Sequence, residues 1–290
     1  MLKYKLVLKT LSIALLSSLL FILSNCSNGN APESTTIAVD SLEISEDIET
    51  QSYLLPTPLQ MAYIFRKSGL KYESGITNTT ANASKYSSTY GQSLNLGVYS
   101  SDMAYCVLNN QSQEAITYLK TVKNLSDKLG MSSAFNSESL VERFEKSISN
   151  HDSIMLILSE IQSKSEEVLT SNDKKATSAI IFTGAWVESM YIGLKVAVKT
   201  KDKKFSPQVI DQMGILDNLI KALKSYEAKD VNITGLITDL NSIKDVYNNF
   251  EGVKKLLPDD EAAMDMEISD TEISDLSKKI EELRNKIVNG

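Results

Sequence analysis

The spacing of apolar residues is the feature that most limits how this chain can fold. From Gln92 to the C-terminus, apolar residues recur at steps of three and four, which places them on one side of an α-helix. The pattern predicts helices over residues 57–68, 92–109, 116–129, 140–148, 154–169, 178–199, 206–223, 236–250 and 273–287. No run alternates between apolar and polar residues for long enough to predict a strand. Because short connections join successive helices, we expect an all-α fold, an antiparallel multi-helix bundle.

Residues 178–199 form the most apolar of the predicted helices, with apolar side chains almost all round. Such a helix is either the core of a bundle or a membrane span. Glu188 lies in its middle, and a charge there costs about 3 kcal/mol on insertion into a bilayer. We therefore interpret the segment as a bundle core. Small residues at every fourth position would let a second helix approach closely, and these are Ala185, Ser189, Gly193 and Ala197.

Glu188 is the candidate functional carboxylate, because a carboxylate on a buried helix needs a partner or a raised pKa. In the functional interpretation it lines a ligand pocket together with Trp186 and Tyr191. In the ordinary interpretation it forms a structural ion pair, with Arg66 as a suggested partner, or lies at the edge of the core. The sequence favours the ordinary interpretation and leaves the other open.

The C-terminal segment, residues 271–290, predicts an amphipathic helix with an apolar seam over two heptads. The seam consists of Ile273, Leu276, Ile280, Leu283 and Ile287. Ser269 and Glu272 predict a capping box at its start. An acidic linker, residues 258–270, separates it from the main helical domain, residues 53–257. Because so short a helix is marginal alone in water, it docks on its own bundle, self-associates or binds a partner.

The composition excludes several classes of function. A single histidine excludes any intramolecular site that needs two imidazoles, and a net charge of −7 argues against nucleic-acid binding. Neither a glycine-rich phosphate loop nor a GxSxG motif occurs. We therefore expect a non-enzymatic protein without cofactor or metal. Cys106 falls in an apolar-patterned helix, so we expect its thiol to be buried.

The N-terminus has the pattern of an export signal. Three lysines among the first nine residues precede an apolar run over residues 11–23, which is too short for a comfortable membrane span. The sequence Leu23-Ser24-Asn25-Cys26 then resembles the lipobox of bacterial lipoproteins, although Asn25 stands where Gly or Ala is usual. The whole chain is also similar to the uncharacterised all-helical lipoproteins of Bacteroidota.

The resemblance implies that residues 1–25 are a signal peptide, cleaved between Asn25 and Cys26. It also implies that Cys26 carries diacylglycerol, which holds the protein on a membrane. Residues 26–52 are polar and acidic, and predict a lipidated flexible tether. The implied location is the cell envelope, at the outer membrane facing the periplasm, with the inner membrane and the cell surface as alternatives.

Two functional hypotheses follow from these features. The leading one is a lipid-anchored envelope protein that binds a protein partner or supports an envelope assembly. The alternative is a lipoprotein that binds a small molecule or glycan in a cleft near Trp186 and the tyrosine-rich segment 86–105. A deep pocket with converging polar groups favours the alternative, whereas an exposed apolar groove or a detachable C-terminal helix favours the protein partner.

Overall fold

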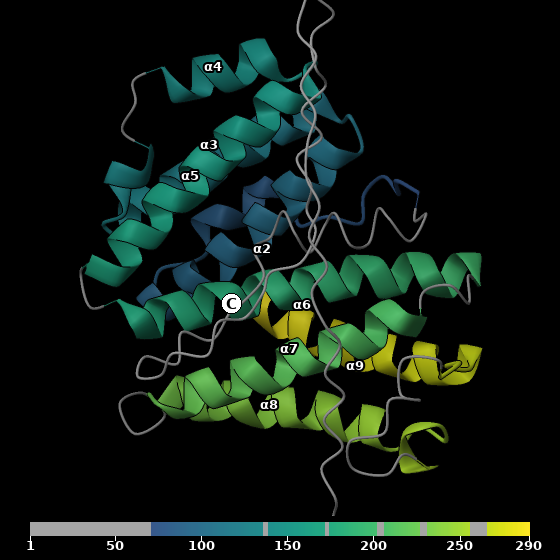
Figure 1. The fold of residues 1–290 in the computed structure, drawn as a ribbon. Coiled ribbons are helices and arrows are strands. Elements are labelled where there is room, and N and C mark those ends of the chain that lie inside the picture. The colour runs from purple at the N-terminus through teal and green to yellow at the C-terminus, as the bar shows by residue number, and fades with distance from the viewer. Residues whose placement is uncertain (1–70, 136–138, 172–173, 202–205, 227–230, 256–265) are drawn as a thin grey trace, which may run out of the picture. The chain divides into compact units, whose positions relative to one another are not determined.

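The computed structural model describes residues 71–135, 139–171, 174–201, 206–226, 231–255 and 266–290. Over these ranges the chain is all-α and contains no strand, as the apolar spacing predicts (Figure 1). Several predicted features lie outside the described residues. These are the signal peptide with Asn25 and Cys26, the tether, the helix predicted over 57–68, Arg66 and most of the acidic linker. The described residues all belong to one compact unit.

The observed helices match the predicted ones to within a few residues. They are α2 (Thr89–Leu108), α3 (Ser112–Lys128), α4 (Leu140–Ser147), α5 (His151–Ser171), α6 (Lys175–Thr200), α7 (Ser206–Lys224), α8 (Val231–Asn248) and α9 (Asp270–Asn289). Short 3₁₀ turns include η1 (Thr80–Ser84), η2 (Ser132–Phe135) and η5 (Val253–Lys255). Local signals set the ends, because Gly130 follows α3 with a φ of 67° and the predicted capping box of Ser269 and Glu272 starts α9.

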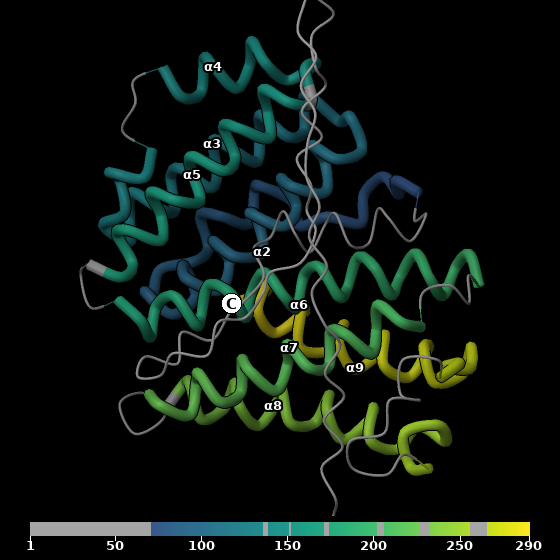
Figure 2. The backbone as a smooth tube through the Cα atoms, in the orientation of Figure 1, coloured from purple at the N-terminus to yellow at the C-terminus, as the bar shows by residue number. Residues whose placement is uncertain are grey.

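Two hydrophobic clusters lie on either side of the α2–α6 pair. One is built mainly from α6, α7, α8 and α9, and the other from α2, α3, α4, α5 and η2. The tube in Figure 2 shows the same division, with α7 and α8 on one side of α6 and α3, α4 and α5 on the other. Cys106 belongs to the second cluster and is buried, which confirms the sequence prediction.

Helices α2 and α6 cross so closely that two glycines are needed at the contact. A Cβ atom on Gly97 would lie 2.0 Å from the carbonyl oxygen of Ile181, and one on Gly184 would lie 1.9 Å from that of Leu94. The hydroxyl of Ser101 donates to the Ala185 carbonyl oxygen at 2.9 Å. The predicted close contact between two helices is therefore present. The glycine that α6 contributes is Gly184, which directly precedes Ala185, the first residue of the predicted row.

Helix α6 is long and apolar enough to cross a membrane by length and composition, but 83% of its most apolar window is buried inside the bundle. Its neighbours are the other helices, since α2 and α9 pack along it. The structure thus agrees with the interpretation of residues 178–199 as a bundle core.

Helix α9 is docked on its own bundle. The five residues of its apolar seam are each at most 5% exposed and lie in the first hydrophobic cluster. Two side chains from α2 and the segment before it satisfy carbonyls in its last turn: the Tyr86 hydroxyl donates to Val288 at 2.9 Å, and the Asn95 amide donates to Ile287 at 3.0 Å. The C-terminal helix is therefore part of the same compact unit, rather than a separate segment.

Candidate functional site

Glu188 of α6 forms a buried ion pair with Arg284 of α9. The Arg284 Nε and Nη2 atoms donate to the two carboxylate oxygens at 2.9 and 3.0 Å. The side chains are 0% and 11% exposed. The guanidinium also lies over the ring of Tyr191, 4.5 Å from its centre. The ordinary interpretation of Glu188 is thus the one that the structure shows, with a partner 96 residues further along the chain.

Asp102 of α2 adds a second carboxyl group to this pair. It is fully buried, and its Oδ2 accepts from the backbone N–H of Asn78 at 3.1 Å. Burial and the negative charge of Glu188 raise the pKa of Asp102 well above its ordinary value. Burial also raises the pKa of Glu188, but Arg284 opposes that shift. With one guanidinium for two carboxyl groups, Asp102 is the carboxyl group that keeps its proton, and its Oδ1 has no hydrogen-bond partner among the described residues.

We expect the substitution Asp102→Asn to remove a pH dependence of stability. The amide resembles the protonated acid in shape and in lacking a charge, and its oxygen can accept from the Asn78 N–H as the acid does. In the unfolded chain Asp102 titrates near 3.8, whereas the folded chain holds the proton to higher pH. The folded state then binds more protons, so stability falls as pH rises above about 4, by at most about 1.4 kcal/mol per pH unit. The Asp102→Asn variant has no carboxyl group to titrate here, so it does not lose this stability as pH rises.

Urea unfolding between pH 4 and pH 8 measures the effect. Asp102→Asn should be more stable than the wild type at pH 7 and similar to it near pH 4. Asp152→Asn, at an exposed position on α5, is the matched control and should follow the wild-type curve. A wild-type slope that persists in Asp102→Asn would show that Asp102 is ionised in the fold.

The tyrosine-rich segment serves the fold around this cluster. The hydroxyls of Tyr99 and Tyr118 donate to the carbonyls of Thr79 and Asn78, both at 2.9 Å. These bonds and the Asn78–Asp102 contact hold the segment before η1 against α2 and α3. Tyr86, which bonds α9, is 3% exposed. These tyrosine hydroxyls are therefore bonded within the protein, and Tyr86, Tyr99 and Tyr118 line neither of the two pockets described below.

The structure does not bring Trp186, Glu188 and Tyr191 into one pocket. Since a helix turns by about 100° per residue, Trp186 and Glu188 point in nearly opposite directions. Trp186 is buried in the first hydrophobic cluster, at 2% exposure. Tyr191 lines an open pocket of about 270 Å³ with residues 73–76 and two lysines. Those lysines, Lys195 and Lys199, are already paired with Glu281 and Glu73.

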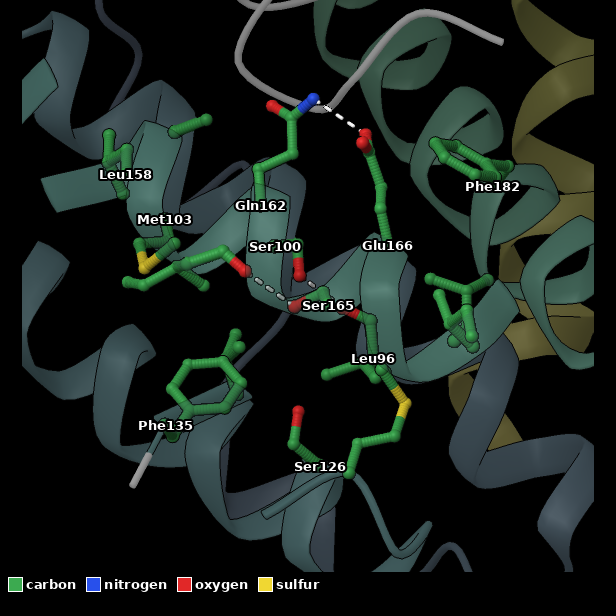
Figure 3. A pocket seen from close by; sticks show the side chains of 16 residues that line it. Leu96, Ser100, Met103, Ser126, Phe135, Leu158, Gln162, Ser165, Glu166 and Phe182 are labelled. Carbon is green, nitrogen blue, oxygen red and sulfur yellow. Dashed lines mark hydrogen bonds between the residues drawn. The ribbon is translucent and has the colours of Figure 1, made fainter. Parts of the chain in front are cut away.

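A second pocket lies between α2, α3, α5, α6 and η2, and it is largely apolar (Figure 3). Its volume is about 120 Å³. The apolar side chains around it are Leu96, Met103, Ala104, Val122, Met131, Phe135, Leu158, Ile161, Leu169, Ile181 and Phe182. For comparison, an engineered apolar cavity of roughly 150 Å³ takes up benzene. The pocket is somewhat smaller than that cavity but is partly open to solvent, so it suits an apolar body of about one aromatic ring.

The polar groups of this pocket differ in whether they already have partners. The hydroxyls of Ser100 and Ser165 donate to carbonyls of their own helices at 2.7 and 2.8 Å. Gln162 donates to Glu166 at 2.9 Å, and Figure 3 shows these two side chains pointing toward one another, away from Phe135 and Ser126. The Ser126 hydroxyl is buried at 1% exposure and has no hydrogen-bond partner among the described residues. It is therefore the group that a ligand could satisfy.

Sequence reasoning missed Asp102 and Arg284. It placed a cleft near Trp186 and segment 86–105, and the pocket is lined by Leu96, Ser100, Met103 and Ala104 of that segment but not by Trp186. A signal for Asp102 existed, because it is the sole charged residue between Lys85 and Glu114. Arg284 follows Leu283 at the edge of the apolar seam, a position from which charged side chains reach a neighbouring helix. The pocket has no local signal, because its walls come from four helices and a 3₁₀ turn.

The described ranges contain no group of three His, Cys, Asp or Glu side chains that could hold a metal ion. No protein-family model, curated protein or solved structure matches this chain. A functional proposal therefore depends on the side chains of the apolar pocket and on the N-terminal sequence.

Proposed function

We propose that this chain is a lipid-anchored cell-envelope protein whose helical bundle binds a small apolar molecule between α2, α3, α5 and α6. The observation that carries the binding proposal is an apolar pocket of about 120 Å³ with an unpaired buried hydroxyl. Protein interiors are close-packed. Because the pocket is partly open to solvent, its apolar walls are exposed to water, at a cost of roughly 25 cal/mol per Å² of apolar surface. An occupant that fills it would recover part of that cost.

A protein partner, the leading hypothesis from sequence, finds less support in the described surface. The seam of α9 is used within the bundle, where its residues are at most 5% exposed. Among the described residues, the large apolar side chains that remain exposed are Leu156 and Val198, on α5 and α6 respectively. Two separate side chains do not form the contiguous apolar patch that marks most partner surfaces.

Blocking the pocket tests the binding proposal. Ser165 lines it from α5 and is half-buried, so Ser165→Phe places a ring where a ligand would lie. With toluene as the probe, calorimetry should show binding to the wild-type chain and at least tenfold weaker binding to the variant. Ser163→Phe makes the same change at an exposed position of the same helix and should bind as the wild type does. Equal binding by both variants would contradict the proposal.

The anchor is a separate part of the proposal, supported by the sequence Leu23-Ser24-Asn25-Cys26. Cells that express the chain should incorporate labelled palmitate into it, and Cys26→Ala should abolish the label because the acceptor thiol is lost. Cys106→Ala is the control, since that thiol is buried in the bundle. Equal label on the wild type and on Cys26→Ala would refute lipidation at this residue.

A further inference from the structure

The hydroxyl of Ser126 is the unusual polar group of the apolar pocket. The hydroxyls of Ser100 and Ser165 donate to the backbone carbonyl four residues earlier, as serine hydroxyls on helices commonly do. Ser126 lies deep on α3 and makes no such bond, although it is 1% exposed. Leaving a buried hydroxyl unpaired costs stability. A hydroxyl can also accept a hydrogen bond as well as donate one, so a ligand hydroxyl could satisfy it in either direction.

The walls around Ser126 set the size of the molecule that could reach it. Two phenylalanines and two methionines, Phe135, Phe182, Met103 and Met131, line the pocket together with aliphatic side chains. The volume of about 120 Å³ suits a body of about one aromatic ring. Methionine side chains adapt to aromatic faces and edges, so this lining favours an aromatic or compact apolar body.

The charges around the pocket disfavour binding of a negatively charged ligand. Among the described residues that line it, none is Lys, Arg or His, so a ligand carboxylate would find no cation. The one charged side chain is Glu166, an exposed residue that accepts from Gln162 at 2.9 Å. A negative ligand would lose its hydration and meet this carboxylate without compensation. The pocket therefore favours an uncharged molecule.

We propose that the ligand is an uncharged amphiphile of about one aromatic ring, such as a small phenol, with its hydroxyl bonded to the Oγ of Ser126. This inference rests on the proposed binding function and adds the chemical class of the ligand. Apolar contact supplies most of the affinity, and the hydroxyl supplies orientation and selectivity.

Three probes of the same shape test the class of ligand. Toluene carries no polar group, p-cresol adds a hydroxyl, and p-toluate carries a carboxylate in its place. We expect the purified wild-type chain at pH 7 to bind p-cresol at least tenfold more tightly than p-toluate. Ser126→Ala should weaken p-cresol binding about three- to tenfold, the range expected for one hydrogen bond. It should leave toluene binding within about twofold.

Ser163→Ala is the matched control, because this hydroxyl is exposed on α5 and does not line the pocket. It should leave the affinity for p-cresol unchanged, and thermal melting verifies that both alanine variants are folded. If toluene binds but Ser126→Ala leaves p-cresol affinity unchanged, or if p-toluate binds most tightly, the inferred class is wrong while the apolar binding site stands. Failure of all three probes to bind the wild type would overturn both proposals.

Discussion

Arg284→Met should lower the free energy of unfolding by about 3–5 kcal/mol at pH 7, the largest loss expected for a single charge in this protein. Methionine preserves much of the apolar stem of arginine but removes both bonds to Glu188, which are 2.9 and 3.0 Å long. Glu188 is 0% exposed, so water cannot replace the lost guanidinium. Asp102, already held neutral beside it, offers no positive charge. Urea unfolding at pH 7 measures the change.

The pH dependence of this loss identifies its cause. Without Arg284 the pKa of Glu188 rises further, because burial then acts unopposed. Protonation relieves the buried charge, so the difference between variant and wild type should shrink as pH falls toward 4. Lys286→Met is the control. Lys286 lies on α9, as Arg284 does, and forms an ion pair with Asp239 of α8, but the Lys286 side chain is 63% exposed. That loss should stay below about 1 kcal/mol.

A rescue variant separates buried charge from lost packing. Adding Glu188→Gln to Arg284→Met removes the unpaired negative charge, so the double variant should recover a substantial part of the stability. If the single variant costs less than about 1 kcal/mol, or if Glu188→Gln brings no recovery, the pair does not hold α6 and α9 together as described.

Gly184→Ala should destabilise the bundle by at least about 2 kcal/mol, although alanine is intrinsically the better helix former by about 1 kcal/mol. The new Cβ would lie 1.9 Å from the carbonyl oxygen of Leu94. No side-chain rotation can relieve that clash, because the obstacle is backbone, so α2 must move away from α6. Such a shift also disturbs the 2.9 Å bond from Ser101 to Ala185. Thermal and urea unfolding measure the loss.

For Gly214→Ala, at a second helical glycine, we expect the opposite effect, a gain in stability. Nothing lies within 4 Å of a Cβ built on Gly214, which is exposed on α7. This variant should gain up to about 1 kcal/mol from helix propensity alone. If the two glycine variants change stability equally, the close approach of α2 and α6 does not determine the cost.

The all-α fold and most helix limits follow from local patterns. Apolar spacing located the helices, and the capping box of Ser269 and Glu272 marked the start of α9. These features depend on neighbours three or four residues apart, so the sequence contains them directly. Burial of Cys106 and of residues 178–199 followed from the same patterns.

The candidate sites could be predicted only in part. The position of Glu188 in an apolar helix showed that it needs a partner, but the partner is 96 residues away on α9. Arg284 reaches it only because α9 docks, and Asp102 joins because α2 lies against α6. The row of small residues similarly predicted a close contact, whereas the crossing itself selected Gly184 and Gly97.

The sequence by itself therefore determined the helices, their caps, the presence of a buried carboxylate that needs compensation, and the signal on which the lipid anchor is proposed. Only the tertiary structure decided which charges pair, that α9 completes the bundle, and that an apolar pocket surrounds Ser126. The physical reason is the range of the interactions. Helix formation is decided within a turn or two of chain, whereas ion pairing and cavity walls depend on how separate helices pack.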